Sequence, residues 1–128
     1  MKILGIGVDI IENKRIKILL KNKAFIKRMF SKNEIKFAIK VSNKINFYAK
    51  RFAAKESLAK SLGTGFRNNL NFKDIQIEND KFGKPFFSKT KKIDEIINNK
   101  FKIKRYNLFL SISDEKDYSV AFTILQGK

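Results

Sequence analysis

Two acidic residues of this sequence lie where their neighbours predict an apolar environment. Asp9 follows an apolar run that contains Gly5 and Gly7, and Glu56 lies on the apolar face of a predicted helix, one turn before Lys60. A carboxylate on an apolar face is destabilising unless it pairs with a cation or binds a metal. Together the two carboxylates would form an oxygen site, and Mg²⁺ is usually held by such a site with waters and substrate phosphates.

Each of these residues also has a purely structural explanation when it is considered alone. Glu56 and Lys60 have the i,i+4 spacing of a helical ion pair, and an aspartate at a strand end commonly begins a turn or caps a helix. The segment Gly63-Thr64-Gly65 predicts a helix end, although its backbone could also approach phosphates closely. The residues by themselves leave these alternatives open.

The composition limits the chemistry of this chain. Its 128 residues include no cysteine and no histidine. Thiolate nucleophiles, disulfides, serine–histidine triads and imidazole metal ligands are therefore excluded. Any catalysis must use carboxylates, lysines, arginines, hydroxyls, backbone groups or a metal held by oxygen atoms. Without histidine, the general base of a reaction would be either a metal-bound water or a carboxylate, and the sequence leaves both open.

The net charge has two explanations, because a composition rich in Lys, Ile, Asn and Phe also follows from A/T-rich codons, whereas a charge that serves a partner would favour a nucleic acid, an anionic membrane or an acidic protein. Lys and Arg number 29 against 12 Asp and Glu, which gives a formal charge of +17, and such an excess attracts polyanions. A nucleic-acid-binding module without catalysis is therefore the alternative to an enzyme, and an oligomerisation domain without a ligand is a second alternative. Against the nucleic-acid module, the sequence lacks an aromatic-rich RNA-recognition signature, and such a module has no use for buried carboxylates.

The hydrophobic pattern predicts one α+β domain over residues 1–128, with helices mostly in the first half and hairpins in the second. A capping box at Ser31 and Glu34 predicts the start of one helix. No run reaches the ~18 apolar residues of a membrane span, and no targeting segment is evident, so a cytoplasmic location is expected. The expected strands cover 3–11, 72–78, a segment from 85, 108–113 and 118–125, and the expected helices cover 13–30, 32–41, 46–62 and 91–99.

Four motifs resemble the signatures of the bacterial holo-acyl-carrier-protein synthases, in the same order along the chain. They are Gly5-Ile6-Gly7-Val8-Asp9-Ile10 with Arg15-Ile16, Arg51-Phe52-Ala53-Ala54-Lys55-Glu56-Ser57-Leu58-Ala59-Lys60 with Gly63-Thr64-Gly65, Asp80-Lys81-Phe82-Gly83-Lys84-Pro85, and Leu110-Ser111-Ile112-Ser113 with Tyr118-Ser119-Val120-Ala121. The second motif is specific, whereas the Gly-Lys-Pro turn alone would be a weak signal. The resemblance covers nearly the whole chain.

The resemblance implies a Mg²⁺-dependent 4′-phosphopantetheinyl transferase of the small trimeric group. Such enzymes transfer the 4′-phosphopantetheine group of coenzyme A to a serine of apo acyl carrier protein and release adenosine 3′,5′-bisphosphate. The expected fold is 4′-phosphopantetheinyl transferase-like, with an antiparallel sheet packed with helices, and the expected assembly is a homotrimer. Coenzyme A and the carrier protein would be the partners, with no nucleic acid and no membrane.

The resemblance also implies roles for single residues. Asp9 and Glu56 match the magnesium ligands, and with Lys60, which matches a phosphate-binding lysine, they would form the catalytic group. The residues that match the coenzyme A site are Arg51, Lys60 and Gly63.

Arg15 matches a contact with the carrier protein. Carrier proteins are acidic, so a basic segment after Arg15 would favour docking. The segment also contains Lys17, Lys21, Lys23, Lys27 and Arg28.

Asp114 departs from the family pattern, which usually has histidine near the nucleotide phosphates. An aspartate there would repel the phosphates, so this contact of the family is in doubt.

For the homotrimer, apolar side chains of the final hairpin are expected to contact a neighbouring subunit, although some must face the core of their own chain. The candidates are Phe109, Leu110, Ile112, Phe122 and Ile124.

Overall fold

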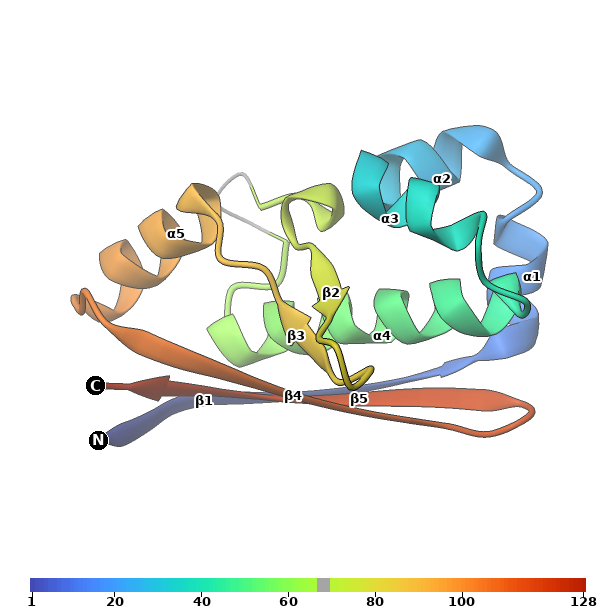
Figure 1. Ribbon diagram of the computed structural model, residues 1–128. Coiled ribbons are helices and arrows are strands. Elements are labelled where there is room, and N and C mark those ends of the chain that lie inside the picture. The colour runs from blue at the N-terminus through green and yellow to red at the C-terminus, as the bar shows by residue number, and fades with distance from the viewer. Residues whose placement is uncertain (67–69) are drawn as a thin grey trace.

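The computed structural model describes residues 1–66 and 70–128, and its base is a three-stranded antiparallel sheet (Figure 1). In this sheet β1 (Lys2–Glu12) and β4 (Tyr106–Asp114) flank β5 (Tyr118–Gly127). The first and last strands are paired, so the two ends of the chain lie side by side (Figure 1). The sequence predicts all three strands, and each runs slightly further than its apolar pattern indicates.

One long helix, α4 (Lys44–Leu62), lies along one face of this sheet (Figure 1). The side chain of Asn43 caps its start, because Oδ1 accepts a hydrogen bond from the backbone N–H of Asn46 at 3.0 Å. Gly63 ends the helix in the left-handed conformation, with φ of 74°, which glycine adopts without steric strain. The predicted helix over 46–62 is confirmed, with two further residues at its start.

Three short helices precede α4 where a single helix over 13–30 and a second over 32–41 were the expectation. The first prediction is wrong because the chain turns at Lys21, after which the Oδ1 atom of Asn22 accepts from the N–H of Ala24 at 2.9 Å and starts a new helix. The apolar spacing continues across this turn, so it gives no sign of the break. The three helices are α1 (Asn13–Leu19), α2 (Lys23–Met29) and α3 (Lys32–Ala38).

The predicted capping box at the start of α3 is confirmed. The hydroxyl of Ser31 accepts from the N–H of Glu34 at 3.1 Å, and Glu34 Oε1 accepts from the N–H of Ser31 at 3.0 Å. The Glu34 side chain is also buried. A capping residue can remain at the surface, so capping alone does not account for this burial.

The second half of the chain contributes a small hairpin and one helix. β2 (Ile77–Asn79) pairs antiparallel with β3 (Pro85–Phe87), and α5 (Lys91–Phe101) follows. The helix expected over 91–99 is thus confirmed and slightly longer. In the part of the chain that the structure describes, no helix is long and apolar enough to cross a membrane.

The strand expected over 72–78 is wrong in its first half. Phe72–Asp74 is a short 3₁₀ turn, which is held by a hydrogen bond from the N–H of Asn71 to Asp74 Oδ2 at 2.9 Å. The alternating isoleucines that suggested a strand are buried on either side of Gln76. Only the segment from Ile77 onward pairs with another strand.

The two faces of the main sheet differ in their surroundings. One face packs on α4, whereas the other carries exposed apolar side chains from all three strands, namely Ile6, Val8, Ile10, Phe109 and Phe122. Of the five residues expected to contact a neighbouring subunit, Phe109 and Phe122 are exposed at 50% and 39%, and Ile124 is half-buried. Leu110 and Ile112 pack on the core of their own chain instead.

Candidate functional site

The candidate site forms where β1 lies directly against α4. A Cβ atom on Gly5 would lie 1.8 Å from the carbonyl oxygen of Ser61, and one on Gly7 would lie 1.9 Å from that of Ser57. Only glycine lets the strand come this close to the helix backbone. The backbone of α4 therefore occupies the space that a side chain would need at both positions.

Asp9 lies two residues after Gly7 on β1, so its side chain also points toward α4. The ammonium group of Lys60 lies 3.1 Å from Asp9 Oδ1 and donates to the carbonyl oxygen of Val8 at 3.0 Å. In the described chain Lys60 therefore pairs with Asp9, rather than with Glu56 as in the helical alternative. The Lys60 side chain is 52% exposed, so its ammonium group remains accessible to an anionic ligand.

Glu56 lies half-buried beside this pair. Burial raises the pKa of Glu56, the nearby charge of Asp9 raises it further, and Lys60 lowers it. The carboxylates of Asp9 and Glu56 therefore repel each other. The single positive charge of Lys60 does not offset the combined effect of this repulsion and of burial on the pKa of Glu56. Additional positive charge would stabilise this arrangement.

The donor atoms fit a hard divalent cation. Within residues 1–66 and 70–128, no three or more Asp, Glu, His or Cys side chains come together in a way that could hold a metal. Asp9 and Glu56 thus offer two carboxylates rather than a complete cage. Since Mg²⁺ commonly uses one or two carboxylates and takes its other oxygens from waters and substrate phosphates, the two residues fit a magnesium ion that a phosphate-bearing substrate helps to hold.

The apolar face that the sequence predicts for α4 is only partly correct. Ala49, Ala53 and Ala59 on that face are buried, but Glu56 is half-buried and Lys60 is exposed. The contact with the sheet also includes small polar side chains, because the hydroxyls of Ser57 and Thr123 share a hydrogen bond of 2.6 Å. The apolar pattern gave no signal for this contact, because serine counts as polar.

Arg51 belongs to a second group of residues, beside β2. Its side chain is buried, and Nη2 donates to Asn79 Oδ1 at 2.6 Å. The guanidinium carbon lies 4.3 Å from the ring centroid of Phe47, a distance typical of a cation–π contact. Burial lowers the pKa of Arg51, and the charge of Glu34 opposes this effect.

Lys55 forms a buried ion pair that the sequence did not predict. Its ammonium group donates to Glu34 Oε1 at 2.6 Å and to the carbonyl oxygens of Met29 and Phe72 at 2.9 and 3.0 Å. All three protons of the ammonium group are used, and the side chain is fully buried. The only sequence signal for this pair was the position of Lys55 among buried residues of the helix. Glu34 gave no signal of its own, because the capping box already accounted for it.

The remaining predicted residues lie at other places on the surface. Gly63 ends α4, where its N–H donates to the carbonyl oxygen of Lys60 at 3.0 Å and where Lys100 donates to the carbonyl oxygen of Leu62. Arg15 is exposed on α1. The basic residues that accompany it are also exposed, namely Lys17, Lys21, Lys23, Lys27 and Arg28.

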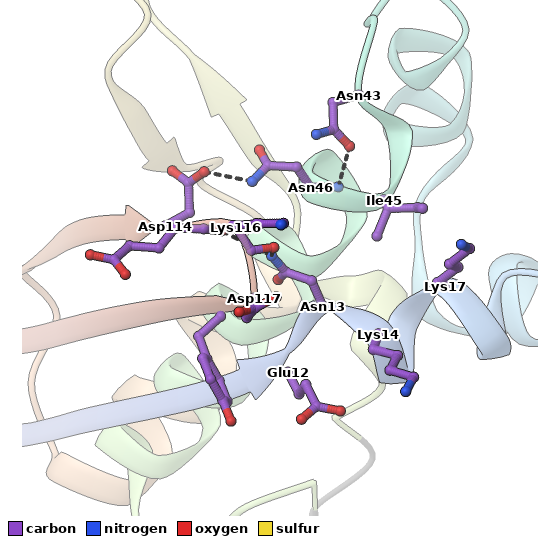
Figure 2. Close-up of a pocket in the computed structure, with 12 residues that line it drawn as sticks. Glu12, Asn13, Lys14, Lys17, Asn43, Ile45, Asn46, Asp114, Lys116 and Asp117 are labelled. Carbon is purple, nitrogen blue, oxygen red and sulfur yellow. Dashed lines mark hydrogen bonds between the residues drawn. The ribbon is translucent and has the colours of Figure 1, made fainter.

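Asp114 lies at the turn between β4 and β5, beside a hollow of about 710 Å³ (Figure 2). Its Oδ2 atom accepts a hydrogen bond from Asn46 Nδ2 at 2.5 Å. Lys14 and Lys17 line the opposite side of this hollow (Figure 2). The Asp114 carboxylate is therefore held by a side chain at the start of α4.

Comparison with known proteins gives consistent matches over the whole chain. A family model described as the 4′-phosphopantetheinyl transferase superfamily matches residues 5–123. The chain is 64% identical over 128 residues to the holo-[acyl-carrier-protein] synthase of Pelagibacter ubique (strain HTCC1062), with 100% of both sequences covered.

Solved structures show the same likeness. The crystal structure of holo-[acyl-carrier-protein] synthase from Neisseria meningitidis matches with a TM-score of 0.87 and 38% identity, covering 97% of this chain and 98% of that chain. The structure of a holo-(acyl-carrier-protein) synthase from Bacillus anthracis in complex with CoA (3′,5′-ADP) matches with a TM-score of 0.83 and 34% identity over 100% of both chains. Because the family model spans every predicted site residue from β1 to α4, and relatives match over their full length, the chain belongs to the 4′-phosphopantetheinyl transferase superfamily.

Proposed function

We propose that this chain transfers the 4′-phosphopantetheine group of coenzyme A to a serine of apo acyl carrier protein, giving holo acyl carrier protein and adenosine 3′,5′-bisphosphate. The observation that carries the proposal is the group of Asp9, Glu56 and Lys60 at the contact of β1 with α4. The names of the relatives and the coenzyme A complex from Bacillus anthracis support it. Residues 1–128 would form one transferase domain, which would act in the cytoplasm and supply holo carrier protein to fatty acid biosynthesis.

The reaction requires charge neutralisation, because both the attacked diphosphate and the leaving group are anionic. The serine oxygen would form a bond to the phosphorus of the pantetheine phosphate while its proton passes to a water molecule or a carboxylate. The bond from that phosphorus to the bridging oxygen would break and release adenosine 3′,5′-bisphosphate. Phosphoryl transfer depends mainly on positioning and electrostatic stabilisation. Asp9 and Glu56 would hold Mg²⁺, which when bound supplies positive charge beside the diphosphate oxygens, and the accessible ammonium group of Lys60 would bind a phosphate oxygen.

Arg51 and Gly63 are the proposed further contacts of coenzyme A. Gly63 has no side chain to obstruct a ligand at the end of α4, and Arg51 offers a guanidinium group of fixed orientation, which suits phosphate. Asp114 would repel the nucleotide phosphates if it faced them, so the contact made by histidine elsewhere in the family is not expected in this chain.

The basic surface around Arg15 is the proposed docking site of the carrier protein. Arg15 and the neighbouring basic residues of α1 and α2 are exposed, and the whole chain carries a formal charge of +17. Complementary charge speeds association with an acidic partner and favours one orientation.

The exposed apolar face of the sheet is the proposed contact between the subunits of a homotrimer. Val8 and Phe122 are paired across neighbouring strands on this face, and Phe109 extends it onto β4. An apolar surface of this kind is usually buried against another chain. Light scattering should give about three times the 14.9 kDa of one chain, and Phe122→Asp should yield monomers, whereas a wild-type chain that is fully active as a monomer would contradict the trimer.

The transfer is tested by incubating the protein with apo carrier protein, coenzyme A and Mg²⁺. Mass spectrometry should show that the carrier protein gains one phosphopantetheine group, and omission of coenzyme A is the control. Binding of a random oligonucleotide without any transfer would support the nucleic-acid-binding alternative instead.

A further inference from the structure

We propose that Asn79 is a positioning residue, which orients the guanidinium group of Arg51 and ties it to the turn between β2 and β3. The inference rests on the proposed function in one respect, because it takes Arg51 to be a contact of coenzyme A. Neither the family resemblance nor the predicted site residues include Asn79, and its role follows from contacts in this structure.

The Arg51 guanidinium group has partners on three sides, but not all of its N–H groups form hydrogen bonds. The ring of Phe47 covers one face at 4.3 Å, Asn79 accepts from Nη2 at 2.6 Å, and Glu34 Oε2 lies 3.9 Å from Nε. Among the described residues, Nε is buried without a hydrogen-bond partner. Because a distance of 3.9 Å is too long for a hydrogen bond, the bond to Asn79 is the short directional contact that sets the orientation of the group.

Asn79 uses both ends of its amide. While Oδ1 accepts from Arg51, Nδ2 donates to the carbonyl oxygen of Gly83 at 2.8 Å. The turn itself is held by further hydrogen bonds, since Asp80 Oδ1 accepts from the N–H groups of Phe82 and Lys84 at 2.8 and 2.9 Å. Asn79 therefore joins the side chain of a buried arginine on α4 to a preformed turn.

The guanidinium group lines a hollow of about 190 Å³ beside β2. Asn79 and Glu78 contribute polar side chains to the same hollow, and Phe37 contributes an aromatic one. A ligand that contacts Arg51 here would meet a donor whose direction is already fixed, and fixing a donor beforehand increases affinity by lowering the entropy lost on binding. Loss of the Asn79 amide would remove this advantage without removing the charge.

The test compares Asn79→Ala with Asn99→Ala, which removes an exposed asparagine of α5 as a matched control. By calorimetry, Asn79→Ala should weaken coenzyme A binding by roughly 10-fold, as expected for one hydrogen bond to a charged group. The KM for the carrier protein should stay at the wild-type value, because the proposed docking surface lies on α1 and α2. The Tm should fall modestly, because the buried guanidinium group of Arg51 loses its short hydrogen bond. Unchanged coenzyme A affinity in Asn79→Ala would overturn the proposal.

A double-mutant cycle tests whether Asn79 acts through Arg51. In an Arg51→Lys background, the additional Asn79→Ala change should alter coenzyme A affinity by less than about twofold. If the two effects instead multiply, Asn79 acts on the ligand independently and the positioning role is wrong.

Nuclear magnetic resonance separates this inference from the proposed function. The Nε–H signal of Arg51, identified by its loss in Arg51→Lys, should shift and broaden in Asn79→Ala and stay unchanged in Asn99→Ala. A wild-type protein that binds no coenzyme A would refute the proposed function, but the Arg51 signal would still decide the positioning role. An unchanged Arg51 signal in Asn79→Ala would refute that role.

Discussion

Lys55 and Glu56 are consecutive residues of α4, yet their charges have opposite surroundings. The ammonium group of Lys55 is fully buried and bound by three protein oxygens. The carboxylate of Glu56 is half-buried near a second carboxylate, and its pKa is raised by burial and by that charge. A buried charge whose partners all come from the protein stabilises the fold, whereas a charge left in repulsion is available to a ligand.

The group around Lys55 is complete without a ligand. Glu34 Oε1 accepts from Lys55 and from the N–H of Ser31, and Oε2 accepts from the N–H of Ile77 at 3.2 Å. These contacts join α3, α4 and β2. The group around Asp9 is open to solvent, since Lys60 is half exposed. This difference predicts that substitutions around Lys55 will mainly reduce stability, whereas substitutions around Asp9 will mainly reduce the transfer rate.

Lys55→Met should cause the largest loss of stability. Removing one partner of a buried ion pair leaves Glu34 charged and buried, which typically destabilises a protein by about 3–5 kcal/mol. Urea denaturation should therefore show a much lower midpoint than for Lys91→Met, which removes an exposed lysine of α5. Equal midpoints for the two variants would mean that the pair contributes nothing to folding.

Asp9→Ala and Glu56→Ala should show the reverse pattern. Each removes one of the two proposed magnesium ligands, so the rate of phosphopantetheine transfer should fall by about 100-fold or more, while the Tm changes little. Glu95→Ala on α5 is the control, because Glu95 is an exposed carboxylate away from the site. Near-normal turnover of Glu56→Ala in the presence of Mg²⁺ would contradict the assignment.

Gly7→Ala should affect both stability and activity. Its Cβ atom would lie 1.9 Å from the carbonyl oxygen of Ser57, so β1 would have to move away from α4 and take Asp9 with it. Overpacking of this kind typically destabilises by about 1–3 kcal/mol. Asn99→Ala is the control, because Asn99 is exposed on α5 away from the site and should leave the transfer rate unchanged. Equal activity of the two variants would show that the close contact is not needed for the site.

The difference between the two groups also explains what the sequence could predict. Asp9, Glu56 and Lys60 were detectable because each carries a charge inside an apolar pattern, and the structure brings all three together. The pairing of Glu34 with Lys55 was hidden, because the residues are 21 positions apart and a local capping box already accounted for Glu34. Ile77 gave no signal, since its contribution is a backbone N–H group.

The fold shows the same division between local and distant causes. The capping box of α3 and the end of α4 at Gly63 depend on neighbouring residues, and both were predicted. The break between α1 and α2 depends on Asn22 as a cap inside an uninterrupted apolar pattern, so periodicity alone could not locate it. The partner of Arg51 was equally hidden, because Asn79 lies 28 positions away.

Glu56→Gln should have the smallest effect, and its sign distinguishes the two groups. Burial and the charge of Asp9 raise the pKa of Glu56, so the folded protein binds this proton more tightly than the unfolded chain does. By linkage, the contribution of Glu56 to stability then falls as the pH rises from the ordinary pKa of glutamate through the higher pKa of the folded state. At pH 7 without divalent cations, Glu56→Gln should therefore have a slightly higher Tm than the wild type. The gain should disappear below the ordinary pKa, where Glu56 is protonated in both states. Added Mg²⁺ should raise the Tm of the wild type more than that of Glu56→Gln, because only the wild type retains both carboxylates. A lower Tm for Glu56→Gln at pH 7 would mean instead that protein groups already stabilise the carboxylate, and Glu56 would then resemble Lys55 as part of the fold.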